Sequence, residues 1–141
     1  MITIELNRLN DGFHFAAVNE SGNTVHLDGS PDIGGENKGM RPMQMLLAAM
    51  GGCSAIDVIN ILKKQRQDLK DIKITVTGER EADAIPSLYQ TVHAHYKFFG
   101  ALDPDKVEKA INLSIDKYCS VSKTLEKGGT KITHSFEIIP A

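Results

Sequence analysis

The sequence predicts a mixed α+β fold in which antiparallel sheets pack on one long buried central helix. Short segments of alternating apolar and polar residues, the pattern of half-buried strands, occur on both sides of residues 42–66, which are mostly apolar. Two shorter segments within residues 104–127 repeat apolar residues at helical spacing. The expected order is three strands, a helix, two strands, two helices and a last strand, in a single domain of 141 residues.

Residues 1–28 are expected to form an N-terminal β-meander. Apolar residues alternate along three short runs: Ile2, Ile4, Leu6; Phe13, Phe15, Ala17; and Val25, Leu27. The segments Asn10–Gly12 and Glu20–Asn23 separate these runs and are rich in turn-forming residues. The loop of residues 29–41, with four glycines, has a length that is more often functional than incidental. We expect it to be a flap over the functional site.

The central helix is expected over residues 42–66. Pro42 suits its first turn, and the basic residues Lys63, Lys64 and Arg66 suit its C-terminus. From Met43 to Ile56 the residues are apolar or small on every side of the helix, so the helix should be buried all round. One chain of this length offers too little surface to cover it, which predicts a homodimer.

The C-terminal half is expected to contain a β-hairpin at residues 72–99, helices at 104–127 and a last strand at 131–139. Asp103 and Pro104 have the residue types of an N-cap and a first helical position. Gly128 and Gly129 are typical of a helix end. The first of the two helices is expected to run to about Tyr118.

Composition and charge restrict the partners. The chain is 41% hydrophobic and 24% charged with a net charge of -2, which gives no electrostatic reason to expect nucleic acid. The uncharged stretch Pro42–Ile56 is shorter than the roughly 20 residues of a membrane-spanning helix, so no membrane partner is expected. The N-terminal residues lack a signal-peptide pattern, and a cytoplasmic location is expected.

Two cysteines in a reducing compartment are free thiols, a redox pair or inert core residues. The absence of a CxxC motif excludes a zinc site built only from cysteine, and neither a metal site nor a cofactor is expected. Cys53 lies in the apolar helix, where a lone cysteine is usually a packing residue. Cys119 lies by the start of a helix, where backbone N–H groups favour an anion.

Several other residues allow both a structural and a functional interpretation. Gly51 and Gly52 either permit close helix packing or leave room for a substrate beside Cys53. His93 and His95 have a spacing that can bind metal, although a solvated or subunit-facing surface fits their polar neighbours better. His134 shares a face with apolar residues and is expected to point inward.

The residues of two segments resemble signatures of the OsmC and organic hydroperoxide resistance family. Residues 42–53, PMQMLLAAMGGC, with Asp57-Val58 and the ILKK of residues 61–64, resemble its central helix. LDPDKV at 102–107 and DKYCSV at 116–121 resemble its second signature. The resemblance covers nearly the whole chain and is strongest to the OsmC-like, YhfA-type branch. It implies an OsmC-like fold and an intertwined homodimer with two sites at the interface.

The resemblance also implies a thiol-dependent peroxidase that acts on organic hydroperoxides. Cys53 would attack the O–O bond and become a sulfenic acid, and Cys119 would resolve it as a disulfide. A dithiol reductant protein would then restore both thiols. The candidate substrate channel consists of four apolar residues on the central helix: Met43, Leu46, Leu47 and Met50.

The sequence departs from the family pattern where the attacking thiolate is paired with charge. In active members an Arg held by a Glu stabilises the thiolate, but Met43 and Gln44 occupy the two positions where that Glu is expected. We name Arg41 and Gln44 as candidate thiolate-stabilising residues. Asp57 lies one turn after Cys53, where its charge would oppose thiolate formation. The alternative is a non-catalytic OsmC-like protein that binds a small apolar ligand at the dimer interface, with structural cysteines.

Overall fold

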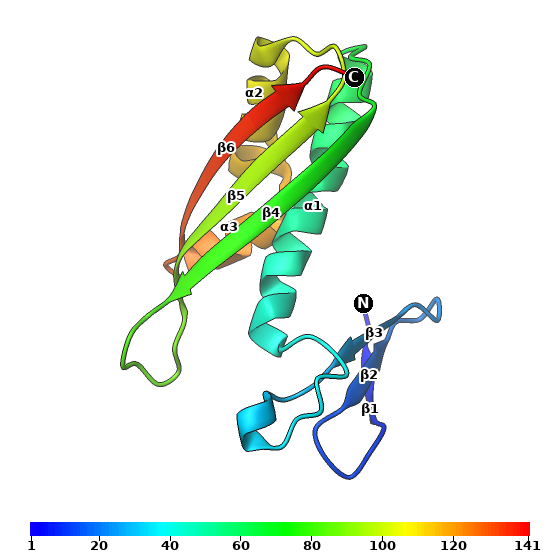
Figure 1. Ribbon diagram of the computed structural model, residues 1–141, viewed down its shortest axis with the longest axis vertical. Coiled ribbons are helices and arrows are strands. Elements are labelled where there is room, and N and C mark those ends of the chain that lie inside the picture. The colour runs from blue at the N-terminus through cyan, green and yellow to red at the C-terminus, as the bar shows by residue number, and fades with distance from the viewer. The chain divides into compact units, whose positions relative to one another are not determined.

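A computed structural model describes all residues, Met1–Ala141. They form two compact units, Met1–Leu46 and Leu47–Ala141, and each unit contains one three-stranded sheet (Figure 1). The predicted mixed α+β class is confirmed. The assignment of residues 1–141 to a single domain stays a prediction.

The N-terminal unit contains the predicted meander. The strands β1 (Glu5–Arg8), β2 (Phe15–Val18) and β3 (Thr24–Leu27) pair antiparallel in the order β1-β2-β3. Ile2 and Ile4 lie before β1, and Phe13 lies outside β2. The late start of β2 follows from the side chain of Asn10, which accepts backbone N–H bonds from Gly12 at 3.0 Å and from His14 at 3.2 Å and so curls the chain before β2.

The loop of residues 29–41 is ordered around one buried carboxylate. Asp28 is 2% exposed and accepts backbone N–H bonds from Gly29, Glu36 and Lys38 at 2.8 to 3.1 Å. The bond from Lys38 contributes most to lowering the pKa of Asp28, so the carboxylate stays ionised and continues to accept these bonds. Its role as a flap stays a prediction.

Helix α1 (Pro42–Lys64) matches the predicted central helix to within two residues at its end. Burial within one chain is confined to one stripe, Met50, Ser54, Val58 and Leu62, spaced four residues apart. Ile56 and Ile59 on other faces are 71% and 42% exposed. The single chain supplies packing partners for one face of α1 only, and the cover of the other faces by a second copy stays a prediction.

The apolar character of α1 also bears on the expected absence of a membrane. An 18-residue window of the helix has a mean hydropathy of 1.8, and by length and composition alone this helix could cross a membrane. The expectation of no membrane-spanning helix counts only the uncharged stretch Pro42–Ile56. This criterion is too strict, because spanning helices tolerate a small number of charged residues. Core helices of soluble proteins have the same character, and the absence of a membrane partner stays a prediction.

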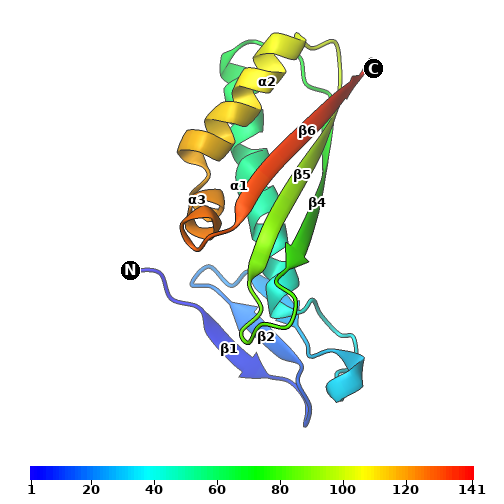
Figure 2. The same ribbon diagram turned by 90° about the vertical axis from the view of Figure 1, so that its left-hand side faces the viewer.

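The sheet of the C-terminal unit consists of β4 (Asp71–Arg80), β5 (Tyr89–Phe99) and β6 (Lys131–Ile139), in the order β4-β5-β6. The β4–β5 pair is antiparallel, as expected of the predicted hairpin. The β5–β6 pair is parallel, which corrects the prediction of purely antiparallel sheets. Residues 100–130 form a helical crossover that returns the chain to the end of the sheet where β5 begins. Figure 2 shows the helices on one face of this sheet.

The crossover contains α2 (Pro104–Leu113), the π-helical turn η2 (Ser114–Tyr118) and α3 (Ser120–Lys127). Asp103 is the N-cap of α2, and its carboxylate accepts from the Asp105 backbone N–H at 3.0 Å, as the sequence predicts. The regular helix ends at Leu113 rather than near Tyr118. Tyr118, at the end of this wider turn, is 51% exposed.

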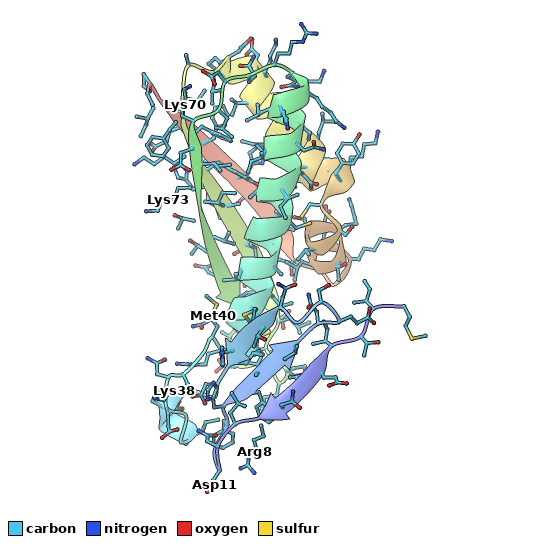
Figure 3. The ribbon with its side chains drawn as sticks, turned by 90° about the vertical axis from the view of Figure 1, so that its right-hand side faces the viewer. Arg8, Asp11, Lys38, Met40, Lys70 and Lys73 are labelled. Atoms are coloured by element: carbon cyan, nitrogen blue, oxygen red, sulfur yellow. The ribbon has the colours of Figure 1, made fainter.

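The core of the C-terminal unit lies between the sheet and the helices. Val92, Ala94, Tyr96 and Phe98 of β5 are fully buried, as their alternation predicts, and the exposed Lys73 on β4 points away from α1 (Figure 3). Tyr89 departs from this alternation, because a β-bulge at Glu79/Arg80 shifts the register and turns Tyr89 inward to 7% exposure. A Cβ on Gly78 would lie 2.6 Å from the Tyr89 ring, so glycine makes room for the ring.

Candidate dithiol site

The two cysteines come together although they lie far apart in the sequence. Cys53 is on α1, Cys119 is the N-cap of α3, and both are free thiols. The Sγ atoms of Cys53 and Cys119 and a carboxylate oxygen of Asp57 all lie within 4.8 Å of one another. Cys53 and Asp57 face the same place because residues four apart share one side of a helix. We refer to these three residues as the dithiol site.

Cys119 is 2% exposed and is held by Ser122. The Ser122 hydroxyl donates to Cys119 Sγ at 3.1 Å, and the Ser122 backbone N–H donates to the same sulfur at 3.4 Å. The predicted position of Cys119 at the start of a helix is confirmed. The helix start is expected to favour the thiolate, but the pKa of Cys119 is raised overall. Burial raises the pKa of Cys119, and a hydrogen bond to the Cys53 thiol raises it further, against the lowering effect of the two bonds from Ser122.

A chain of buried hydroxyls leads to Asp57 from the interior. Tyr96 Oη lies 2.6 Å from Ser54 Oγ, Ser54 Oγ lies 2.9 Å from Ser114 Oγ, and Ser114 donates to Asp57 Oδ2 at 3.1 Å. Tyr96, Ser54 and Ser114 are fully buried. Each hydroxyl has one hydrogen, and the Ser114 hydrogen is used on Asp57. Ser54 must therefore donate to Ser114, and Tyr96 to Ser54, so the chain runs in one direction.

This direction requires Tyr96 to keep its proton. Burial raises the pKa of Tyr96, and the nearby groups Cys119 and Asp57 raise it further when they carry negative charge, while the bond with Ser54 lowers it. Tyr96 therefore remains a phenol at neutral pH and a permanent donor to the chain. The carboxylate of Asp57 is oriented by this network.

The π-helical turn positions two of these groups. The Cys119 backbone N–H donates to the Ser114 carbonyl at 2.6 Å, an i to i−5 bond that closes η2. This bond joins a residue that contacts Asp57 to the cysteine of the site. Such widened turns occur often at functional sites.

The two glycines before Cys53 have different environments. A Cβ on Gly51 would lie 3.0 Å from Val76 Cγ2 on β4, so Gly51 permits close packing of α1 on the sheet. A Cβ on Gly52 would meet nothing within 4 Å. Close packing thus explains Gly51 but not Gly52.

The candidate thiolate-stabilising residues have other hydrogen bonds. Gln44 Oε1 accepts from the Arg41 backbone N–H at 3.1 Å, the arrangement of an N3 residue that caps a helix start. The Arg41 guanidinium donates to the Gly39 carbonyl at 2.8 Å and to Asn37 Oδ1 at 2.7 Å. Their roles toward Cys53 stay predictions.

The candidate channel residues differ in burial. Met50 is fully buried in the core, and Leu46 is 38% exposed. Leu47 is half-buried, and its Cδ2 would lie 3.0 Å from a Cβ on Gly78 of β4. Met43 is also half-buried. The channel itself stays a prediction.

The histidines of β5 bind hydroxyl groups of β6. His93 Nδ1 lies 2.6 Å from Thr133 Oγ1, and His93 Nε2 lies 2.9 Å from Ser135 Oγ. His95 Nδ1 lies 2.7 Å from the same Ser135 hydroxyl. These contacts fit the polar sheet surface that the neighbouring residues predict. His134 is half-buried on the face that Ala94 shares.

Sequence reasoning missed four residues of the site: Ser54, Tyr96, Ser114 and Ser122. Ser54 is visible in retrospect as a polar residue in an apolar helix, one position after Cys53. Ser114 and Ser122 interrupt otherwise ordinary helical patterns. Tyr96 has the alternation of a core residue, and nothing in the sequence distinguishes it from its apolar neighbours on β5.

Comparison with known proteins shows the family. A family model described as OsmC-like protein matches residues 35–135. Protein YhfA of Escherichia coli strain K12 is 41% identical over 132 residues, which cover 93% of this chain and 94% of YhfA. This chain belongs to the OsmC-like family.

Solved structures show the same fold. A hypothetical protein from Aquifex aeolicus VF5 is 32% identical with a TM-score of 0.81, and the match covers 99% of this chain and 98% of that one. The organic hydroperoxide resistance protein OhrB of Bacillus subtilis has a TM-score of 0.67 at 16% identity over 97% and 98% of the two chains, which shows a shared fold. The predicted OsmC-like fold is confirmed.

Proposed function

We propose that this protein is a thiol peroxidase that reduces organic hydroperoxides through Cys53 and Cys119. The observation that carries the proposal is the meeting of two free thiols, from distant parts of the sequence, within 4.8 Å. Organic hydroperoxide resistance proteins share the fold, which supports the substrate class.

The reaction has two steps at sulfur. The Cys53 thiolate attacks one oxygen of the hydroperoxide ROOH, the O–O bond breaks, and the leaving alkoxide takes up a proton to become the alcohol ROH. Cys53 is then a sulfenic acid. The Cys119 sulfur attacks Cys53 Sγ, the sulfenic oxygen leaves as water, and a disulfide forms. A dithiol reductant protein returns the disulfide to two thiols.

The environment of each sulfur supports these roles. Cys53 is half-buried and offers the more accessible sulfur, whereas Cys119 is 2% exposed. Because the pKa of Cys119 is raised, Cys119 keeps its proton and its thiol can donate a hydrogen bond to a Cys53 thiolate. Once the sulfenic acid has formed, Cys119 attacks as it loses its proton, and that proton goes to the sulfenic oxygen, which leaves as water.

We further propose a homodimer, located in the cytoplasm, without nucleic acid or membrane partners. A second copy would cover the exposed apolar residues Ile56 and Ile59 of α1. Arg41 would stabilise the thiolate, and the apolar side chains of the channel would receive the hydrocarbon part of the hydroperoxide. Gln44 would act indirectly, by fixing the start of the helix that carries Cys53.

Steady-state reduction of cumene hydroperoxide with dithiothreitol as reductant tests the peroxidase. The wild-type protein should consume hydroperoxide catalytically, Cys53→Ser should lose all catalysis, and Cys119→Ser should be unable to form the internal disulfide. A wild-type rate equal to that of Cys53→Ser would contradict the proposal.

A second candidate function is the non-catalytic binding of an apolar ligand. Two observations favour it: a carboxylate, Asp57, lies beside the thiols instead of a cation that would favour a thiolate, and the N-terminal unit contains an apolar cavity of about 430 Å³. The residues lining this cavity are Leu6, Phe13, Phe15, Leu27, Asp28, Gly29, Ile33 and Pro42. Binding of the apolar dye anilinonaphthalene sulfonate with equal affinity by wild type and Cys53→Ser, together with no hydroperoxide turnover, would favour this candidate.

A further inference from the structure

The side chains of the dithiol site are suited to binding a cation. Two thiols and the Asp57 carboxylate lie within 4.8 Å of one another, and each of the three is negative when ionised. The groups that donate hydrogen bonds to them are neutral: the Ser114 hydroxyl to Asp57, and the Ser122 hydroxyl and backbone N–H to Cys119. Neutral donors offset this charge only in part, whereas a bound divalent cation would stabilise all three ionised groups at once.

We propose that the reduced protein binds one Zn²⁺ through Cys53 Sγ, Cys119 Sγ and a carboxylate oxygen of Asp57. Thiolate and carboxylate are established zinc ligands, and two soft sulfurs favour Zn²⁺ over the hard cations Mg²⁺ and Ca²⁺. Binding releases the two thiol protons to solvent and changes no oxidation state.

The geometry is close to that of a zinc site. Bond lengths of about 2.3 Å to sulfur and about 2.1 Å to oxygen require tetrahedral ligand atoms about 3.6 to 3.8 Å apart. The three atoms already lie within 4.8 Å of one another, so side-chain rotations that move them by roughly 1 Å complete the set. Three protein ligands leave a fourth position for water.

Hydrogen bonds that orient two of the ligands and a route for the ion are also present. Ser114 orients Asp57, and Ser122 orients Cys119, as outer hydrogen bonds do around metal ligands. Asp57 also lies on the wall of a cavity of about 360 Å³, which gives an ion a route to its carboxylate. The other residues lining this cavity are Asn60, Ile61, Lys64, Gln65, Leu113 and Tyr118.

Metal binding and disulfide formation use the same two sulfurs, so they exclude each other. Oxidation of the two zinc-bound thiolates by one hydroperoxide ROOH takes up two protons and gives the disulfide, ROH, water and free Zn²⁺. Zinc should therefore slow the oxidation of the thiols, and oxidation should release zinc. The proposal does not require catalytic turnover, since it concerns only the reduced protein.

The test is a titration of zinc into the reduced protein, in competition with a colorimetric zinc indicator. The protein is first stripped of metal with a chelator, and no peroxide is present. A parallel titration uses cobalt, whose absorption bands report its ligands. We expect one zinc per chain and sulfur-to-cobalt charge-transfer bands. Cys53→Ser and Cys119→Ser should lose these bands, and Asp57→Asn should weaken zinc binding by about 10- to 100-fold. Zinc affinity should rise with pH, because binding releases two thiol protons.

Two control variants identify the ligands. Asp116→Asn removes an exposed carboxylate and should leave zinc affinity unchanged. The double variant His93→Ala/His95→Ala removes the other cluster with metal-binding spacing and should also bind zinc as the wild type does. Loss of zinc in the histidine variant, unchanged zinc affinity in Cys53→Ser, or the absence of stoichiometric binding would each overturn the proposal.

The variants should be shown to fold by circular dichroism before titration. If a cysteine variant fails to fold, the sulfur-to-cobalt charge-transfer bands of the wild type still decide, because a site without thiolate ligands gives no such bands. Peroxidase turnover is assayed separately in the presence of a chelator. Failure of zinc binding and failure of the proposed function are therefore distinguishable.

Discussion

The Ser114 hydroxyl donates to Asp57 Oδ2 at 3.1 Å, so the π-helical turn that leads to Cys119 also holds the carboxylate nearest the two sulfurs. One end of this contact belongs to the crossover and the other to α1. The contact therefore couples the two segments that carry the cysteines. Its removal should affect both the stability of the protein and the chemistry of the site.

Ser114→Ala should lower the free energy of unfolding by about 1 to 3 kcal/mol, because Ser54 loses its buried acceptor and Asp57 its donor. Tyr96→Phe removes only the first donor of the chain and should cost about 0.5 to 1.5 kcal/mol. Urea denaturation of both variants measures the two values. A larger loss for Tyr96→Phe than for Ser114→Ala would contradict the direction assigned to the chain.

The raised pKa of Cys119 makes stability depend on pH. Between the ordinary thiol pKa of about 8.5 and the raised folded value, the unfolded chain loses its proton first, so the native state binds more protons. The stabilising contribution is complete below about pH 8.5 and is lost as pH rises through the folded value.

Denaturation of the reduced protein between pH 7 and pH 10, in the presence of a chelator, measures this dependence. The wild-type free energy of unfolding should fall above about pH 8.5, and Cys119→Ser should show a flatter profile. Cys53→Ser keeps Cys119 and should retain the fall. Equal profiles for the wild type and Cys119→Ser would show that Cys119 titrates alike in the folded and unfolded states.

Gly51→Ala and Gly52→Ala form a matched pair on α1. Alanine favours a helix by roughly 1 kcal/mol over glycine, but at position 51 the new methyl group would lie 3.0 Å from Val76 Cγ2. We expect Gly52→Ala to stabilise the protein and Gly51→Ala to gain less or to destabilise it. Thermal denaturation ranks the two. If Gly52→Ala destabilises the protein and shifts its oligomeric state, Gly52 contacts a second copy instead of open space.

Asp57→Asn should make the thiols of the site more reactive in metal-free buffer. A unit charge within 4.8 Å interacts with a thiolate by about 1 to 3 kcal/mol, so its removal should increase the thiolate population and move the pH profile of the rate to lower pH. Because a thiolate of lower pKa is also a weaker nucleophile, the alkylation rate at pH 7 should rise by only up to about tenfold. Asp116→Asn should react as the wild type does. An unchanged or slower rate in Asp57→Asn would show that the Asp57 charge does not govern the thiols.

The sequence supports accurate prediction of the local elements. Alternation on β5 identifies the core positions Val92, Ala94 and Phe98, and Asp103-Pro104 marks the start of α2, because these signals depend on neighbours along the chain. The pairing of β5 with β6 is not predictable in this way. The direction of that pair depends on how residues 100–130 cross the sheet, and the last strand has the same alternation in either direction.

The candidate site is predictable in Cys53, Cys119 and Asp57 but not in the hydroxyl groups around them. Cys53 and Cys119 stand out because two signatures resemble those of a family, and Asp57 follows from its helical spacing to Cys53. Ser54, Ser114 and Tyr96 interact across three separate elements, and the π-helical turn that aims Ser114 at Asp57 has no pattern of its own. The apolar sequence of α1 indicates that its other faces need a cover, but a single chain does not show what provides that cover.

The central claim is that Cys53 and Cys119 act as one redox pair, and the most direct test is a thiol count on the reduced protein. The protein receives one equivalent of cumene hydroperoxide in the presence of a chelator, and free thiols and intact mass are then measured. We predict that both thiols disappear together and that the chain loses the mass of two hydrogen atoms, which indicates an internal disulfide. Retention of both free thiols, or oxygen addition at one cysteine without a disulfide, would contradict the claim.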